Sequence, residues 1–239
     1  MSLPDHIRIV LVRPSHPGNI GATARAMMTM GLGRLVLVQP ACFPSQVATD
    51  RASGAVGILK QAVCCDSLQQ AIADCHLVLG TTARDRTVEW PQCTPREAAS
   101  RIAELSSEQQ VAIVFGTERI GLSNEELDLC HTMVRIPCNP EFSSLNLASA
   151  VQILCYEIML MMDLKQGHER PTETLAKQED MQRFYSHLHE VLVELEFLDE
   201  DNPRLLDRRL HRLFNRAALV ESEVQILRGI LTAIQRKNG

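Results

Sequence analysis

VAIVFGTERIGLSNEELDLCHTMVRIPCNPEFSSLNLASAVQILC, residues 111–155, is the stretch that decides the fold of this chain. Its first half predicts a strand, a loop and a short helix. Val111–Phe115 is a short, continuous apolar run, which is typical of a strand buried on both faces of a parallel sheet. Gly116 and Gly121 bracket the polar loop that follows, and residues 123–126, SNEE, form a capping box that starts a helix.

The second half predicts another strand, another polar loop and a long helix. Met133–Ile136 is apolar, and after the loop Ser143 or Ser144 can cap a helix from Leu145 to about Asp163. Two polar loops thus follow neighbouring strands at the edge where open α/β sheets bind ligands. Neither GxGxxG nor GxxxxGK[ST] occurs, so neither a Rossmann dinucleotide site nor a P-loop is supported. Taken alone, the pattern also fits two ordinary strand–helix turns.

Composition indicates a globular protein with one large domain, or a domain with a smaller appendage. The chain has 239 residues, of which 45% are hydrophobic and 22% charged. No apolar run is long enough to span a bilayer, and the N-terminus MSLPDHIRIVLVR lacks a signal-peptide pattern, so we expect a cytoplasmic location. The 8 cysteines show neither CxxC pairs nor zinc spacing, which predicts reduced thiols and no metal site.

The N-terminal region predicts a central strand followed by a helix. Ile7–Val12 is apolar on both faces, and a turn rich in proline and glycine separates it from a helix over Ile20–Met30. Arg25 lies in that helix among small residues, and by itself it fits a solvated arginine on an amphipathic helix. Residues 47–60 mix alanines and glycines with Arg51 and favour a helix near the mouth of the site.

The middle of the chain continues the alternation of strands and helices. Leu35–Val38 predicts a strand, Leu68–Ala73 a short helix, and His76–Gly80 a buried strand. The polar loop 81–86, TTARDR, follows that third strand, and Pro95–Leu105 predicts an exposed helix before the stretch quoted first.

The C-terminal part differs in character from the rest. We expect a domain over residues 1–164, a polar linker over 165–178 and a small all-helical domain over 179–239. A stripe of arginines lies along the second of three helices there, at positions 204, 208, 209, 212 and 216. The net charge of −5 argues weakly against a nucleic-acid partner, but phosphate binding needs only a local basic face. A solvated charged face is the alternative.

Three segments, NIGATAR at 19–25, FGTERIGLSNEEL at 115–127 and IPCNPEFSSLNLASAV at 136–151, resemble the motifs of the SPOUT superfamily of RNA methyltransferases, in its ribose 2′-O-methyltransferase branch. The resemblance covers residues 7–163. It implies an α/β fold, a SPOUT-type parallel sheet flanked by helices with a deep trefoil knot, here followed by the small all-α domain. It also implies S-adenosyl-L-methionine as cofactor and a homodimer with its active sites near the subunit interface.

The resemblance assigns roles to residues of the three motifs and of the 81–86 loop. The catalytic residues it implies are Arg25, Ser144 and Asn146. The cofactor-binding residues it implies are Thr81, Thr82, Ala83, Gly116, Ile136, Ser143, Ser144 and Leu145. The substrate-binding residues are expected to be Asn19, Arg84 and Arg86, together with Arg208, Arg209 and Arg212 of the arginine stripe.

Within the superfamily the chain looks most like the bacterial tRNA (cytidine/uridine-2′-O-)-methyltransferases, which modify nucleotide 32 of the anticodon loop. A guanidinium stays protonated, so we expect Arg25 to stabilise the developing alkoxide or to hold the adjacent phosphate rather than to act as a base. tRNA is the expected partner, with neither DNA nor a membrane. The alternatives are an rRNA ribose methyltransferase, a base methyltransferase, a non-catalytic RNA-binding protein, and an α/β module that only binds adenosine ligands.

Overall fold

The computed structural model describes residues 4–83, 91–142, 144–165, 174–198 and 204–238. Within them a seven-stranded sheet has the order β3-β2-β1-β6-β4-β7-β5, and every pairing is parallel. The strands are β1 (Ile7–Val12), β2 (Arg34–Val38), β3 (Val63–Cys65), β4 (Leu77–Thr81), β5 (Gln92–Cys93), β6 (Val111–Phe115) and β7 (Thr132–Val134). The expected parallel sheet flanked by helices, with a helical C-terminal domain, is confirmed.

Alternating side chains divide the sheet into two buried faces, because successive residues of a strand point to opposite sides. On β1, Ile7, Ile9 and Leu11 enter one core cluster, while Val10 and Val12 enter the other. β1 and β6 are buried at every position, which explains their continuous apolar sequences.

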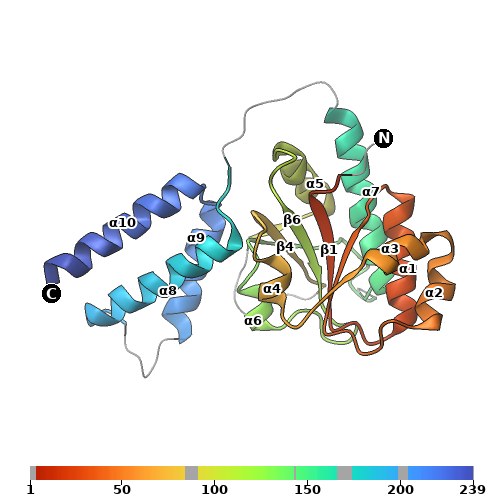
Figure 1. Cartoon of the computed structure of the whole chain (residues 1–239), viewed down its shortest axis with the longest axis horizontal. Coiled ribbons are helices and arrows are strands. Elements are labelled where there is room, and N and C mark those ends of the chain that lie inside the picture. Colours follow the sequence, from red (N-terminus) through yellow and green to blue (C-terminus); the bar gives the residue numbers. More distant parts are fainter. Residues whose placement is uncertain (1–3, 84–90, 143, 166–173, 199–203, 239) are drawn as a thin grey trace.

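Helices of very different extent cover the two faces (Figure 1). The first face carries α1 (Pro17–Thr29), α2 (Gln46–Ala52), α3 (Val56–Gln61), α5 (Pro95–Glu104) and α7 (Leu147–Lys165). The second face carries two short helices, α4 (Leu68–Ile72) and α6 (Asn124–Leu127). Both capping-box hydrogen bonds predicted for residues 123–126 are present at the start of α6.

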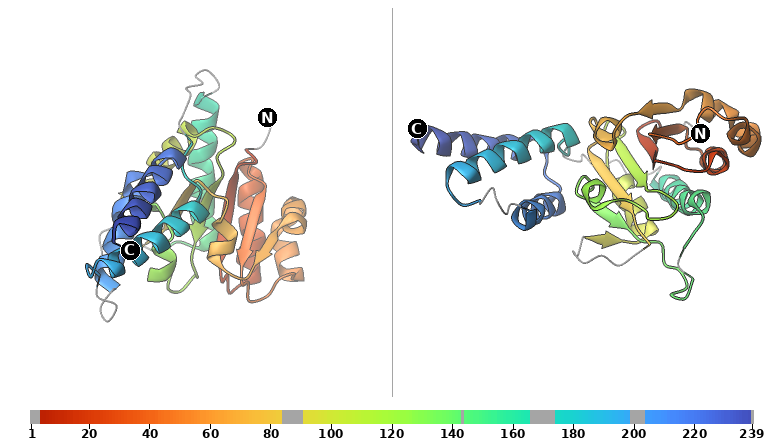
Figure 2. Two further views of the ribbon diagram at one scale, coloured as in Figure 1. Left: turned by 60° about the vertical axis from the view of Figure 1, so that its left-hand side comes forward. Right: turned by 90° about the horizontal axis from the view of Figure 1, so that it is seen from below.

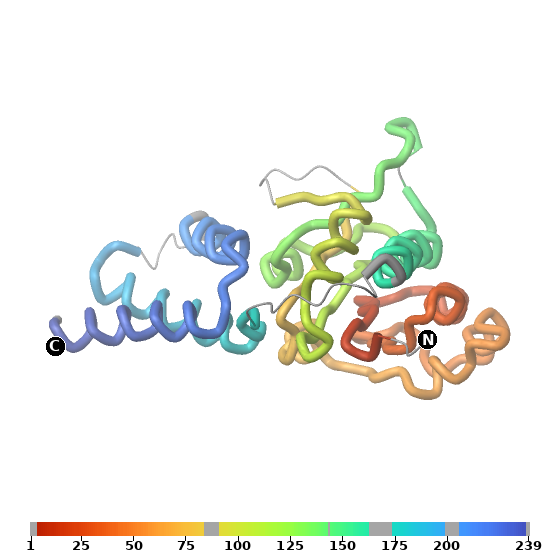
Figure 3. The backbone as a smooth tube through the Cα atoms, turned by 90° about the horizontal axis from the view of Figure 1, so that it is seen from above, coloured from red at the N-terminus to blue at the C-terminus, as the bar shows by residue number. Residues whose placement is uncertain are grey.

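The C-terminal helices form a separate core on the side of α4 and α6 (Figures 1 and 2). They are α8 (Gln178–Glu194), α9 (Arg204–Ala217) and α10 (Glu221–Asn238). Phe184 of α8 contacts Phe214 of α9 edge to face, with ring centroids 4.8 Å apart. Seen from above, these helices lie on the opposite side of the sheet from α1–α3 (Figure 3).

Main-chain carbonyl oxygens of the sheet domain accept hydrogen bonds from the helical domain. The side-chain amide of Gln178 donates to Leu129 O (3.1 Å), and the amide of Asn215 donates to Asp128 O (3.4 Å) and Cys130 O (3.2 Å). The backbone N–H of Gln178 donates to Cys75 O at 2.7 Å. Asn215 is 2% exposed, and these hydrogen bonds satisfy its buried side-chain amide.

Three local predictions need correction, and two strands were missed. The helix over 95–104 is not exposed, because Ala98, Ala99 and Ile102 are buried against α7. The strand predicted over 133–136 ends at Val134, and the long helix begins at Leu147 rather than Leu145. β3 and β5 were not predicted: they have only three and two residues, too few for a periodic signal.

No helix in the described part of the chain is long and apolar enough to cross a membrane. All 8 cysteines lie within the described ranges and none forms a disulfide.

Candidate active site

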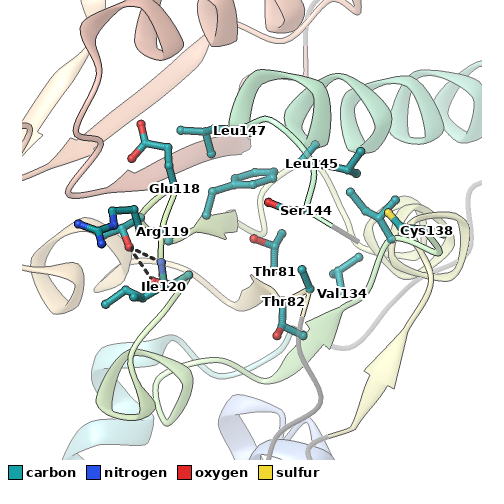
Figure 4. A pocket seen from close by; sticks show the side chains of 17 residues that line it. Thr81, Thr82, Glu118, Arg119, Ile120, Val134, Cys138, Ser144, Leu145 and Leu147 are labelled. Carbon is teal, nitrogen blue, oxygen red and sulfur yellow. Dashed lines mark hydrogen bonds between the residues drawn. The ribbon is translucent and has the colours of Figure 1, made fainter. Parts of the chain in front are cut away.

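A cavity of about 310 Å³ opens at the carboxyl ends of β4, β6 and β7 (Figure 4). Its size is at the lower end of the range for small-molecule sites. Three loops enclose it, one after each strand. The lining residues are Thr81, Thr82, Ala83, Phe115, Gly116, Thr117, Glu118, Arg119, Ile120, Gly121, Val134, Ile136, Cys138, Ser144, Leu145, Leu147 and Ala150.

The loop after β6 is a tight hairpin that only glycine permits at its base. Thr117 and Gly121 exchange backbone hydrogen bonds of 3.2 and 2.9 Å. A Cβ added to Gly116 would lie 2.1 Å from the carbonyl carbon of Gly121, and Gly121 itself has φ of 73°. The two bracketing glycines therefore set the close approach of the backbone that forms one wall of the cavity.

Glu118 joins this loop to the start of α1. Its carboxylate accepts hydrogen bonds from Ser15 N (3.1 Å), Ser15 Oγ (2.9 Å), His16 N (3.3 Å) and Asn19 Nδ2 (3.0 Å). Partial burial opposes the charged form, but the hydrogen bonds from Asn19 and Ser15 prevail and lower the pKa of Glu118 to about 2. Glu118 is therefore an ionised anchor at neutral pH.

Asn146 connects the third loop to Asn19, which also binds Glu118. Its Nδ2 donates to Asn19 Oδ1 at 3.1 Å, and its Oδ1 accepts from Ala148 N at 2.9 Å, which caps α7. The cap predicted at Ser143 or Ser144 is thus supplied by Asn146. Ser15, Asn19, Glu118 and Asn146 form what we call the Glu118 network, which links three segments distant in sequence.

The loop after β4 is fixed by two hydrogen bonds to neighbouring strands. Thr81 Oγ1 donates to Val114 O (3.1 Å), and Thr82 N donates to Val134 O (3.1 Å). In the close-up, Thr81 of this loop, Ser144 of the third loop and Cys138 lie around the same hollow (Figure 4).

Seven of the eight residues predicted to bind the cofactor line this one cavity: Thr81, Thr82, Ala83, Gly116, Ile136, Ser144 and Leu145. Ser143, the eighth, lies outside the described residues, as do Arg84 and Arg86 of the predicted substrate set. The binding roles of all of these remain predictions.

Arg25 does not line the cavity. It is exposed on α1, and the structure brings Asn19 and Asn146 together without it. Within a single chain the cavity and the arginine predicted to be catalytic are therefore separate.

The predicted RNA-binding arginines of α9 differ in their surroundings. Arg208 Nε lies 3.3 Å from Asp128 Oδ1 of the sheet domain, with its side chain 28% exposed. Arg209 is exposed and Arg212 partly exposed. Arg208 thus holds the two domains together, and its role toward RNA stays a prediction.

For Glu118 the sequence suggested an anchor of its loop or a contact with a partner subunit, but not the other members of the network. It did not identify Phe115, Arg119, Ile120, Cys138, Leu147 and Ala150 as lining residues. Phe115 is the last residue of β6, and the others lie within the three loops or in the first turns of α7, so position at a strand end was the available signal. Among the described residues, no group of three or more His, Cys, Asp or Glu side chains could hold a metal ion.

The arrangement suits an adenosine-type ligand better than a phosphate. The walls combine apolar side chains with main-chain donors and acceptors, as seen for Leu145, Leu147, Ile120 and the 116–121 hairpin. Ser144 supplies a hydroxyl to the lining of the same hollow, whereas Asn146 is not among the lining residues. The residues present therefore fit S-adenosyl-L-methionine.

Residues 6–156 match the SpoU rRNA Methylase family, and residues 179–239 match the tRNA methyltransferase TrmJ, C-terminal domain. The chain is 48% identical over 243 residues to tRNA (cytidine/uridine/adenosine-2'-O-)-methyltransferase TrmJ of Pseudomonas aeruginosa, covering 97% of this chain and 95% of that relative. It is 46% identical over 237 residues to tRNA (cytidine/uridine-2'-O-)-methyltransferase TrmJ of Pectobacterium atrosepticum, covering 97% and 98%. Among solved structures, TrmJ from Z. mobilis ZM4 is similar with a TM-score of 0.83 and 38% identity, over 95% of this chain and 98% of that chain.

Proposed function

The chain belongs to the SpoU rRNA Methylase family, and on that premise we propose that it transfers a methyl group from S-adenosyl-L-methionine to the 2′-oxygen of a tRNA ribose. One observation carries the choice of tRNA: the similarity to the TrmJ relatives extends over nearly the full length of both chains and includes the C-terminal helical domain. If only the methyl-transferring part were shared with these relatives, the similarity would not extend over the C-terminal domain.

The cavity residues have a direct use in this reaction. S-adenosyl-L-methionine supplies an electrophilic methyl group on a sulfonium. The main chain of the 116–121 hairpin and the Thr81–Ala83 loop would hold its adenosine part, while Leu145 and Ile136 exclude water from it. Glu118 keeps the hairpin in place against α1.

The ribose 2′-hydroxyl must lose its proton as the new bond forms. Ser144 of the cavity wall would orient this hydroxyl, together with Asn146 of the Glu118 network. Arg25 stabilises the developing negative charge, or holds the adjacent phosphate, because its guanidinium stays protonated.

The position of Arg25 supports a homodimer. The guanidinium is exposed and does not line the cavity of its own chain, so a second copy would bring its Arg25 to that cavity. The deep trefoil knot around the cofactor site, nucleotide 32 as the target, cytidine or uridine as the base, and a cytoplasmic location belong to the same proposal.

The test is methyl transfer from labelled S-adenosyl-L-methionine to unmodified tRNA transcripts, with the modified nucleotide mapped by mass. We expect a ribose methyl at position 32 that is lost in Arg25→Ala. The matched control is Arg96→Ala, which removes an arginine paired with Glu157 at 3.2 Å on α7. Transfer to ribosomal RNA but not to tRNA would contradict the proposed substrate, and Arg25→Lys with full turnover would contradict the need for a guanidinium.

A further inference from the structure

Two arginines of the sheet domain differ from all its other described arginines. Arg8, Arg13, Arg34, Arg96 and Arg101 each donate to an acid, an amide, a hydroxyl or a carbonyl, and Arg119 and Arg135 also have a partner. Arg25 and Arg51 make no side-chain hydrogen bond or ion pair to another described residue. A surface arginine kept without a partner is available to an external anion.

Both arginines lie along the same face of α1. Gly18, Gly21 and Arg25 are spaced by three and four residues, which places them on one side of the helix. A Cβ added to Gly21 would be 2.9 Å from Arg51 Cβ, and one added to Gly18 would be 3.7 Å from Arg51 Cγ. The Arg51 side chain of α2 therefore starts beside Gly21, one turn from Arg25, and extends along α1 toward Gly18.

Close packing of α2 fixes this position. The space that a side chain on Gly21 would fill is taken by the backbone of α2, since an added Cβ would be 2.0 Å from Ala48 O. Asp50, the acid next to Arg51 in sequence, instead accepts a hydrogen bond from Gln46 at 2.8 Å. Among the described residues, neither guanidinium contacts an acid, so both charges are available to an external anion.

Arg51 also lies near the Glu118 network. His16, whose ring is 3.0 Å from the added Cβ of Gly18, donates its backbone N–H to Glu118, and Asn19 follows Gly18 directly. Beyond Arg51 the surface is open, because a Cβ added to Gly54 or Gly57 meets no atom within 4 Å. A strand passing Arg25 would thus continue over Arg51 and onto this open surface.

We propose that Arg51 is a second phosphate-binding residue, which with Arg25 holds successive phosphates of the RNA strand on either side of the methylated ribose. Arg51 is a positioning residue: it fixes the backbone of the substrate and does not touch the reacting atoms. This inference rests on the proposed function for the identity of the ligand as RNA.

The test compares Arg51→Ala and Arg51→Lys with the wild-type chain and with Arg96→Ala, which removes the same charge from a paired site. For Arg51→Ala we expect KM for tRNA to rise on the order of tenfold, with kcat changed less and the Kd of S-adenosyl-L-methionine unchanged. The slope of log Kd for tRNA against log salt should fall by about 0.7–0.9, the value for one lost phosphate contact. Arg51→Lys keeps the charge and should recover part of the loss.

Replacing each phosphate that flanks the target ribose, one at a time, by a neutral methylphosphonate identifies the phosphate that Arg51 contacts. The wild-type chain should lose affinity at one of these positions, and Arg51→Ala should show no further loss there. The proposal is overturned if Arg51→Ala matches Arg96→Ala in KM and salt slope, or if it changes the oligomeric state in size-exclusion chromatography, which would assign the residue to a subunit contact. If the wild-type chain methylates no tRNA, the proposed function fails, whereas the salt slope of tRNA binding still tests Arg51 separately.

Discussion

Asn146 donates a hydrogen bond to Asn19 across 3.1 Å and 127 positions of sequence, while its own carbonyl oxygen caps α7. One side chain thus fixes the start of a helix and joins the first and third motifs. Two substitutions separate these tasks.

Asn146→Asp keeps an oxygen for Ala148 N and adds a negative charge at a helix N-terminus, so the free energy of unfolding should stay within about 1 kcal/mol of wild type. The variant cannot donate to Asn19, and we expect methyl transfer to fall on the order of 10-fold to 100-fold. Asn146→Ala should lose both the cap and the activity. Thermal unfolding and single-turnover transfer are the measurements, and an Asp variant with wild-type turnover would contradict the link.

Glu118→Ala leaves the donors of Ser15, His16 and Asn19 without their acceptor. We expect a loss of about 1–3 kcal/mol in unfolding free energy and weaker cofactor binding, measured by denaturant titration and calorimetry. Glu108→Ala, at an exposed site, is the control. Because the pKa of Glu118 is lowered to about 2, its contribution is complete above about pH 4.5 and is lost only as pH falls toward 2. If the stability difference between wild type and Glu118→Ala changed with pH near neutrality, the lowered pKa of Glu118 would be refuted.

His131 should make stability depend on pH. Burial lowers the pKa of His131 to about 4, and its Nδ1 accepts from Val78 N at 3.0 Å. As pH falls, His131 is protonated in the unfolded chain before it is protonated in the folded one. Its contribution to the free energy of unfolding is therefore complete above about pH 6.5, and about 3 kcal/mol is lost as pH falls toward 4. His131→Asn keeps an acceptor for Val78 N but does not titrate. Chemical denaturation at pH 7.5 and pH 4.5 should show a smaller difference for the variant, and an equal difference would exclude His131 as the cause.

Gly116→Ala should abolish cofactor binding, because the new methyl group would lie 2.1 Å from the Gly121 backbone and open the hairpin. The control is Gly229→Ala in α10, where an added Cβ meets nothing within 4 Å and the helix should gain up to about 1 kcal/mol. Calorimetric titration with S-adenosyl-L-methionine distinguishes the two. Wild-type affinity in Gly116→Ala would show that the hairpin does not form the site.

Arg208 and Arg209 should differ in their effects although they are adjacent. Arg208→Ala removes the ion pair to Asp128 and should increase cleavage between the domains in limited proteolysis. Arg209→Ala, at an exposed position, should leave proteolysis unchanged and weaken tRNA binding. Equal effects of both variants on proteolysis would contradict this division.

Much of the fold and of the cavity was predictable because the strongest signals are local. Continuous apolar runs identified β1 and β6, and the SNEE capping box identified α6. The polar loops after strands predicted where a ligand would bind, but the seven cavity residues came from the resemblance to the SPOUT motifs. Short elements were missed because β3 and β5 depend on pairing with β2 and β7 rather than on a pattern of their own.

The network could not be predicted because it depends on distances across the fold. An anchoring role was expected for Glu118, but its partners Ser15 and Asn19 became clear only because β1 and β6, adjacent in the sheet, bring the two loops together. Similarly, the arginine stripe of α9 gave no sign that Arg208 pairs with Asp128, 80 positions away.

The docking of the helical domain has a consequence for how this family can change over generations. Gln178 and Asn215 bind carbonyl oxygens of Cys75, Asp128, Leu129 and Cys130, atoms that every amino acid possesses. Substitutions at these four positions can therefore accumulate without displacing the C-terminal helices, provided that the backbone keeps its path. The two donors on the appended side have no such freedom. Substitutions should be tolerated at the four positions of the sheet domain and selected against at Gln178 and Asn215.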